Sequence, residues 1–113
     1  MAANQTLVER VRQTLDDCAT PFVEKKMFGG VAFMIYGKMC MTVGKDRMMF
    51  RIDPSEHAKA VAKKGCQAVV MRGRECAGYV RVSSDSLEMK RVFDHWMHRA
   101  LDFNVKLAGE GSK

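Results

Sequence analysis

The feature that most constrains the fold is an apolar stretch, residues 23–52, that is interrupted by glycine at short intervals. Short apolar segments between glycine turns are typical of consecutive strands. The segments are Val23–Phe28, Val31–Tyr36, Met39–Val43 and Arg47–Ile52. Because so much apolar surface is unfavourable in water, the stretch predicts a sheet that neighbouring helices cover.

The interruptions differ in what they predict. Gly37-Lys38 suits a two-residue type II′ hairpin turn, because glycine stands at the first central position. Gly29-Gly30 leaves two alternatives: a bulge that bends one long strand, or a break between two short strands. We favour the bend, so that this stretch makes three strands. In Arg47–Ile52, Met48 and its alternate neighbours point to one face, which predicts one buried side.

Helical patterns lie before and after this stretch. A first helix is predicted from Thr6 to Cys18, with Thr6 and Glu9 forming a capping box. Pro21 follows its end. A second helix is predicted over Pro54–Lys64, because Asp53 is a good cap and proline suits the first helical position.

The remaining chain predicts two strands and a long helix. The strands are Gln67–Met71 and Ala77–Val82, and a polar turn joins them. The last helix is predicted to start at Ser84-Asp85 and end near Leu107, and residues 108–113 are expected to be a flexible tail. The resulting order, α-β-β-β-α-β-β-α, predicts an α+β fold with an antiparallel sheet of about five strands and helices packed on it. A chain of 113 residues is expected to form one domain, 1–113.

The charge of the chain leaves two interpretations open. The net charge is +6 and the pI is about 9.4, which suits nucleic acid or an acidic partner. The basic residues are scattered, however, so we favour a solvated basic surface. The candidate contacts to a partner or to nucleic acid are Lys25, Lys26, Arg72, Arg74 and Arg81.

No pattern of catalytic or metal-binding residues stands out. His95-x-x-His98 could place two imidazoles on one helix face, but a metal site needs further ligands. His57 is expected to be exposed. The four cysteines, at positions 18, 40, 66 and 76, form no Cys-x-x-Cys pair, which indicates free thiols in a reducing cytoplasm. We therefore expect no catalytic residues, no cofactor and no metal.

Two other observations bear on function. No apolar run is long enough to span a membrane, and no signal peptide is visible at the N-terminus, so we expect a cytoplasmic protein with no membrane partner. The chain contains ten methionines. Methionine fills irregular gaps in a core and also suits adaptable binding surfaces, so the surplus fits either use.

The motif residues Met27, Phe28, Gly29 and Gly30, with Gly37-Lys38 and the later Gly78-Tyr79, resemble those of the TfoX/Sxy family's N-terminal domain. The resemblance implies a curved antiparallel sheet with helices, similar to secretion chaperones. The family's founding members regulate competence genes in bacteria as coactivators and carry a second, helical domain. This chain is expected to lack that domain. The resemblance supplies no catalytic residue.

Together these observations predict a small non-enzymatic regulatory or interaction module. We expect it to bind a protein of the transcription machinery, or a regulator, through an exposed sheet edge or a methionine-rich face. The first alternative is an accessory nucleic-acid-binding protein that uses the dispersed basic surface. The second is an enzyme or metal protein. The sequence does not decide between a monomer and a dimer.

Overall fold

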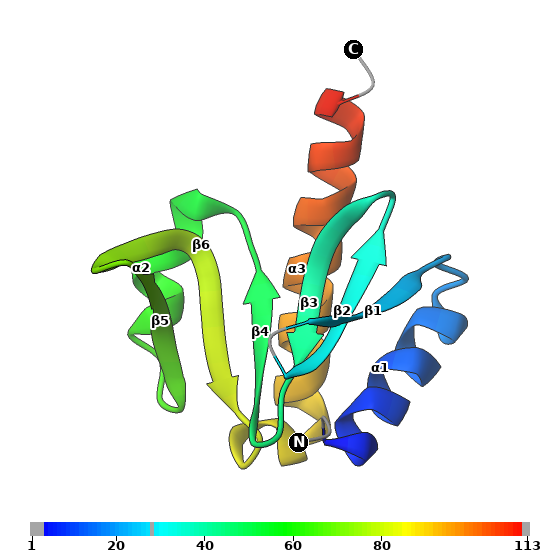
Figure 1. Cartoon of the computed structure of the whole chain (residues 1–113), viewed down its shortest axis with the longest axis horizontal. Helices are drawn as coiled ribbons and strands as arrows, with labels where there is room; N and C mark the ends of the chain where they lie inside the picture. The colour runs from blue at the N-terminus through cyan, green and yellow to red at the C-terminus, as the bar shows by residue number, and fades with distance from the viewer. Residues whose placement is uncertain (1–3, 28, 112–113) are drawn as a thin grey trace.

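Three helices cover one face of a six-stranded antiparallel sheet in the computed structural model, which describes residues 4–27 and 29–111 (Figure 1). The helices are α1 (Gln5–Asp17), α2 (His57–Val61) and α3 (Lys90–Gly111), and 3-10 turns lie at Pro54–Glu56 and Ser86–Glu88. The strands are β1 (Val23–Met27), β2 (Gly30–Ile35), β3 (Lys38–Val43), β4 (Arg47–Arg51), β5 (Cys66–Met71) and β6 (Arg74–Ser83). They lie in the order β1-β2-β3-β4-β6-β5. The predicted α+β class is confirmed, with six strands instead of about five.

The additional strand arises at the glycine pair, where the predicted bend is wrong. Met27 pairs with Gly30, so β1 and β2 form a hairpin. Gly29 has a φ of +73°, a left-handed conformation that glycine adopts without strain. Gly30 lies so close to β3 that a Cβ atom there would overlap the carbonyl oxygen of Val43. The first glycine therefore reverses the chain, and the second allows β2 to approach β3.

The next hairpin also differs from its prediction. Ile35 pairs with Lys38, so the turn residues are Tyr36 and Gly37 and not Gly37-Lys38. Both have positive φ, 54° and 76°, which is the type I′ geometry and not type II′. Type I′ turns match the right-handed twist of the two strands that they join.

Two helices begin elsewhere than predicted. Asn4 caps α1, because its Oδ1 accepts a hydrogen bond from the backbone N–H of Leu7 at 3.2 Å. The predicted capping box is therefore wrong. Asp85 makes no capping bond, and the 3-10 turn that follows it precedes α3. The second helical segment starts as predicted, with Asp53 accepting from the backbone of Ser55.

The last helix is longer than its pattern indicated. It continues to Gly111 and so includes most of the residues expected to form a tail. Adding residues to an existing helix needs no new nucleus, which is why a polar segment can extend it. Residues 112 and 113 lie outside the described part of the chain.

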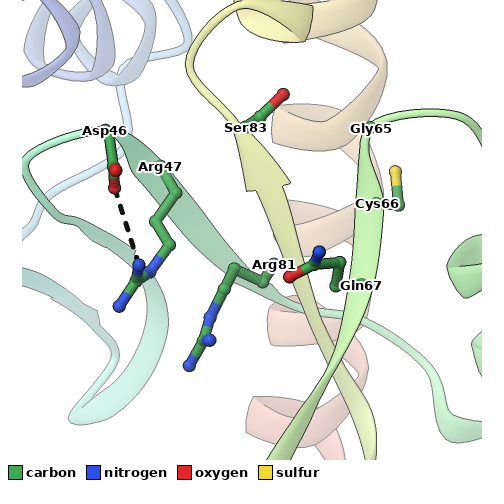
Figure 2. A pocket seen from close by; sticks show the side chains of 7 residues that line it. All are labelled: Asp46, Arg47, Gly65, Cys66, Gln67, Arg81 and Ser83. Carbon is green, nitrogen blue, oxygen red and sulfur yellow. Dashed lines mark ion pairs between the residues drawn. The ribbon is translucent and has the colours of Figure 1, made fainter.

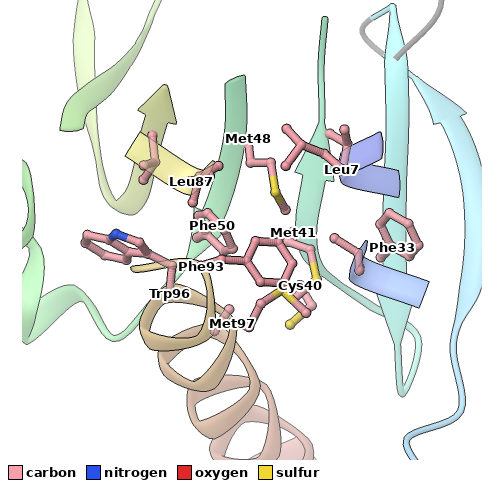
Figure 3. Close-up of a cluster of buried hydrophobic side chains, with 14 of the residues drawn as sticks. Leu7, Phe33, Cys40, Met41, Met48, Phe50, Leu87, Phe93, Trp96 and Met97 are labelled. Carbon is pink, nitrogen blue, oxygen red and sulfur yellow. The ribbon is translucent and has the colours of Figure 1, made fainter. Parts of the chain in front are cut away.

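The core lies between the helices and the sheet (Figure 3). One row of it crosses three paired strands, Met41, Phe50 and Val80, and each of these side chains is fully buried. Phe50 stacks on Trp96 of α3, with 6.0 Å between the ring centres. The predicted alternation in β4 is confirmed, because Met48, like Phe50, is inaccessible to solvent.

Candidate binding groove on the open face of the sheet

The sheet face that points away from the helices, called here the open face, carries a groove of about 720 Å³. Its floor contains Thr42, Met49 and Arg81, which lie in register on β3, β4 and β6. One wall comes from the β1–β2 hairpin, with Met27, and the other from β5, with Met71. Ligand sites commonly enclose about 300–1,000 Å³, so the groove is of binding-site size.

Methionine gives the groove its apolar character. Met27, Met39, Met49 and Met71 all line it. Their unbranched, polarizable side chains can adapt to differently shaped partners. The methionine surplus is thus divided: some of these residues, such as Met41, fill the core, and four line the groove.

Two arginines make one end of the groove positive. Arg81 pairs with Met49, and Arg47 pairs with Ser83, so the two arginines are diagonal neighbours on one face. Figure 2 shows both projecting from β4 and β6. Arg47 contacts Asp46 at 3.5 Å. Arg81 is half-buried, and its side chain forms no ion pair or hydrogen bond with any residue that the structure describes.

A polar recess continues from the arginine end of the groove. It measures about 310 Å³ and shares Arg47 and Arg81 with the groove (Figure 2). Cys66 and Gln67 of β5 lie on its far side. Burial raises the pKa of the Cys66 thiol, and Lys63 offsets this only in part. This thiol is therefore protonated at neutral pH and is a weak nucleophile.

The β5 wall depends on a bend in β6. Ala68 pairs with Val80, and Val70 pairs with Glu75. Between these two pairs β5 contains one residue and β6 contains four, so β6 holds three extra residues. Gly78 lies in this bend with a φ of +88°. Its N–H donates to Nδ1 of His57 at 3.1 Å. Because Nδ1 accepts this bond, Nε2 carries the proton and donates it to the Glu75 carboxylate.

The expectation that His57 is exposed is therefore wrong. Only 9% of its surface is accessible. The residue begins α2, and its ring packs beneath the bend of β6, where it satisfies the backbone of Gly78. Its position in the sequence, in the first turn of a short helix, gave no sign of this contact.

The structure does not bring the five predicted contact residues together. Lys25 and Lys26 are exposed on β1, at one edge of the sheet. Arg72 and Arg74 are exposed at the β5–β6 hairpin, at the other edge. Arg81 alone of the five lines the groove.

Sequence reasoning missed Arg47 as a site residue. The signal that could have found it was the alternation in β4, which places Arg47 on the same face as Met49. The alternation could not show which strand lies beside β4. β6 supplies Arg81, and no pattern in the sequence predicts that β4 pairs with β6.

The family motif residues divide into turn formers and groove residues. Gly29 and Gly37 form turns, and Gly78 lies in the bend of β6. Met27, Gly30 and Tyr79 line the groove. Lys38 begins β3, and Phe28 lies outside the described residues.

The two histidines of the last helix lie in different environments. His95 is half-buried and edge-on to Trp96, and burial lowers its pKa, with Lys63 adding to the effect. His98 is exposed. Within residues 4–27 and 29–111 no three His, Cys, Asp or Glu side chains are placed to hold a metal ion. In the same ranges, none of the helices has the length and apolarity needed to cross a bilayer.

Comparison with known families settles the relationship of the chain. Residues 13–104 match the family model of the TfoX N-terminal domain. The chain belongs to the TfoX N-terminal domain family. No curated protein and no solved structure matches the chain significantly. The groove residues fall inside the matched range, so the groove is part of this TfoX N-terminal domain itself.

Proposed function

We propose that this TfoX N-terminal domain is a non-enzymatic interaction module that binds another protein in its open-face groove. We further propose that it works in the cytoplasm of a bacterium as a coregulator of transcription or competence, with a partner from the transcription machinery or its regulators. The observation that carries the proposal is the groove. Its methionine-rich floor lies on the face that no helix of the described residues covers.

The chemistry of the groove supports binding over catalysis. General acid–base catalysis usually relies on a histidine or a carboxylate placed to move a proton. The described residues that line the groove include neither. Their ionisable groups are the two arginines, Cys76 and Tyr79. Such a lining can hold a ligand by apolar contact and positive charge.

The groove also contains a reporter of occupancy. Cys76 lines the groove, whereas Cys18 is exposed at the end of α1. A partner in the groove should protect Cys76 from a maleimide reagent and leave Cys18 reactive. The two thiols of one chain therefore serve as probe and control.

The test begins with a photo-crosslinking amino acid at position 49, on the groove floor. The matched control carries it at position 91, an exposed site on α3. We expect one protein to be cross-linked in cells from position 49 and not from position 91. That protein, once purified, should protect Cys76 selectively. Equal cross-linking from both positions, or protection of neither thiol, would contradict the proposal.

Nucleic-acid binding is the competing interpretation. Its support is the net charge of +6 together with Arg47 and Arg81 in the groove. Single-strand binders stack bases on several aromatic side chains, and Tyr79 is the only aromatic residue among the described ones lining the groove. Retention on random DNA or RNA that falls steeply with salt would favour this function over protein binding.

A further inference from the structure

We propose that the occupant of the groove is an acidic amphipathic α-helix of the partner protein, whose carboxylates bind Arg47 and Arg81. The inference rests on the proposed function and specifies the chemistry of its partner. Three features of the groove support it: the charge at one end, the paired backbone of the floor and the methionines along its length.

The positive charge of the groove favours a negatively charged segment of the partner. Both of its charged lining residues are arginines, and no Asp or Glu is among the described residues that line it. Arg81 is half-buried without a carboxylate partner in the described chain. A half-buried guanidinium gains most from a carboxylate, because the two groups can form paired, charge-assisted hydrogen bonds. A basic segment would be repelled from the same end.

The floor of the groove favours a helix over an added strand. It is built on β3, β4 and β6, each of which has a strand on both sides. The backbone groups of these strands are therefore engaged within the sheet and cannot pair with an added strand. A segment lying on this floor meets side chains only. It must satisfy its own backbone hydrogen bonds, and a helix does so.

The methionines favour a partner helix that carries a stripe of apolar side chains. Met39 and Met49 lie on adjacent floor strands, and Met27 and Met71 line the two walls. Methionine-rich grooves suit amphipathic helices, which present apolar side chains at positions i, i+3, i+4 and i+7. The acidic residues of the helix would then lie beside this stripe, at the end that opens into the polar recess.

The experiment is an unbiased selection. A display library of random 16-residue peptides is selected on the full-length chain. It is counter-selected on Thr42→Trp, which places a bulky ring on the β3 side of the floor; Met39→Trp replaces it if circular dichroism shows that the first variant is unfolded. We expect the enriched peptides to be acidic, to carry apolar residues at helical spacing, and to gain helicity on binding.

Charge recognition is then measured on the strongest synthetic peptide. Loss of charge-assisted hydrogen bonds to the peptide should make Arg81→Gln bind about tenfold or more weakly. Arg47→Gln should act in the same direction. Arg91→Gln, at an exposed position on α3, is the control and should change nothing. A peptide with glutamine in place of glutamate should bind more weakly and lose its sensitivity to Arg81→Gln.

The outcomes separate this inference from the proposed function. Groove-dependent peptides that are neutral, basic or extended would overturn the acidic helix and leave protein binding intact. Recovery of no groove-dependent peptide would also overturn the inference, and cross-linking from position 49 decides the proposed function independently. Equal effects of Arg81→Gln on the glutamate and glutamine peptides would refute the role of the arginine.

Discussion

The two faces of β4 carry neighbouring residues with opposite roles. Met48 and Phe50 point to the helices and are fully buried, whereas Arg47 and Met49 point to the open face and line the groove. The strand is the same, so the difference comes from what covers each face. Tight packing constrains the helix-covered face. The open face is free of that constraint and can be shaped for a partner.

Truncation of adjacent residues in β4 tests whether the two faces of the strand differ in their contribution to stability. Phe50→Ala removes a fully buried ring that stacks on Trp96 and should cost about 3–5 kcal/mol of unfolding free energy. Met49→Ala should cost less than about 1 kcal/mol and weaken partner binding. Urea denaturation measures the free energy of unfolding of both variants. Similar losses from the two variants would show that the open face also supports the fold.

The glycine pair offers the next largest effect. Gly30→Ala forces a Cβ atom against the backbone of Val43 and should cost about 2–3 kcal/mol through overpacking. Gly29 has open space around it, and asparagine tolerates its left-handed conformation. Gly29→Asn should therefore cost less than about 1 kcal/mol. Thermal unfolding compares the two, and the reverse order would contradict the close approach of β2 and β3.

The bend in β6 should respond to loss of its histidine. His57→Leu leaves the Gly78 N–H without its partner, and an unsatisfied buried donor costs about 1–3 kcal/mol. Glu75→Gln is the control, because an amide oxygen can still accept from Nε2. Hydrogen exchange at Gly78 should accelerate in the first variant only. Unchanged exchange in both would mean that the ring does not hold the bend.

The smallest effect concerns a surface pair and depends on pH. Arg12 donates two hydrogen bonds to Glu24, at 2.6 and 2.8 Å. These bonds lower the pKa of Glu24 below its ordinary 4.5, against an opposing effect of burial. The ionised carboxylate thus stabilises the fold above pH 4.5, and this stabilisation disappears as the pH falls through the lowered pKa.

Glu24→Gln should therefore be slightly less stable than the natural chain at neutral pH. The difference between the two should vanish in acid. Urea midpoints measured across this pH range give the result. A difference that persists at the lowest pH would assign the effect to packing and not to charge.

The sequence predicted the helix-covered face better than the open one. Burial on one side of a strand leaves an alternating pattern, and Met48, Phe50 and Ile52 showed it. Turns were harder, because the same glycines permit a bend or a reversal. At Gly29-Gly30 the choice depended on how closely β2 approaches β3, a tertiary contact. Asn4 was missed as a cap because the later Thr6 offered an equally good local pattern.

Predicting the groove would have required the order of the strands in the sheet, which no local sequence pattern contains. Arg81 was a candidate from the start, but Lys25 and Arg72, considered with it, lie at opposite edges of the sheet. Arg47 joins Arg81 because β6 crosses to pair with β4. Strand order is set by the whole core, so the residues that share a face become known only with the fold.

The bend at Gly78 links one wall of the groove to α2. The floor belongs to strands that have a neighbour on both sides, whereas the β5–β6 wall continues from a bend that the ring of His57 holds. The contact that holds this bend is made by His57 of α2, which is not among the described residues that line the groove. We therefore expect a substitution at His57 to shift the β5–β6 wall while leaving the side chains that line the groove unchanged.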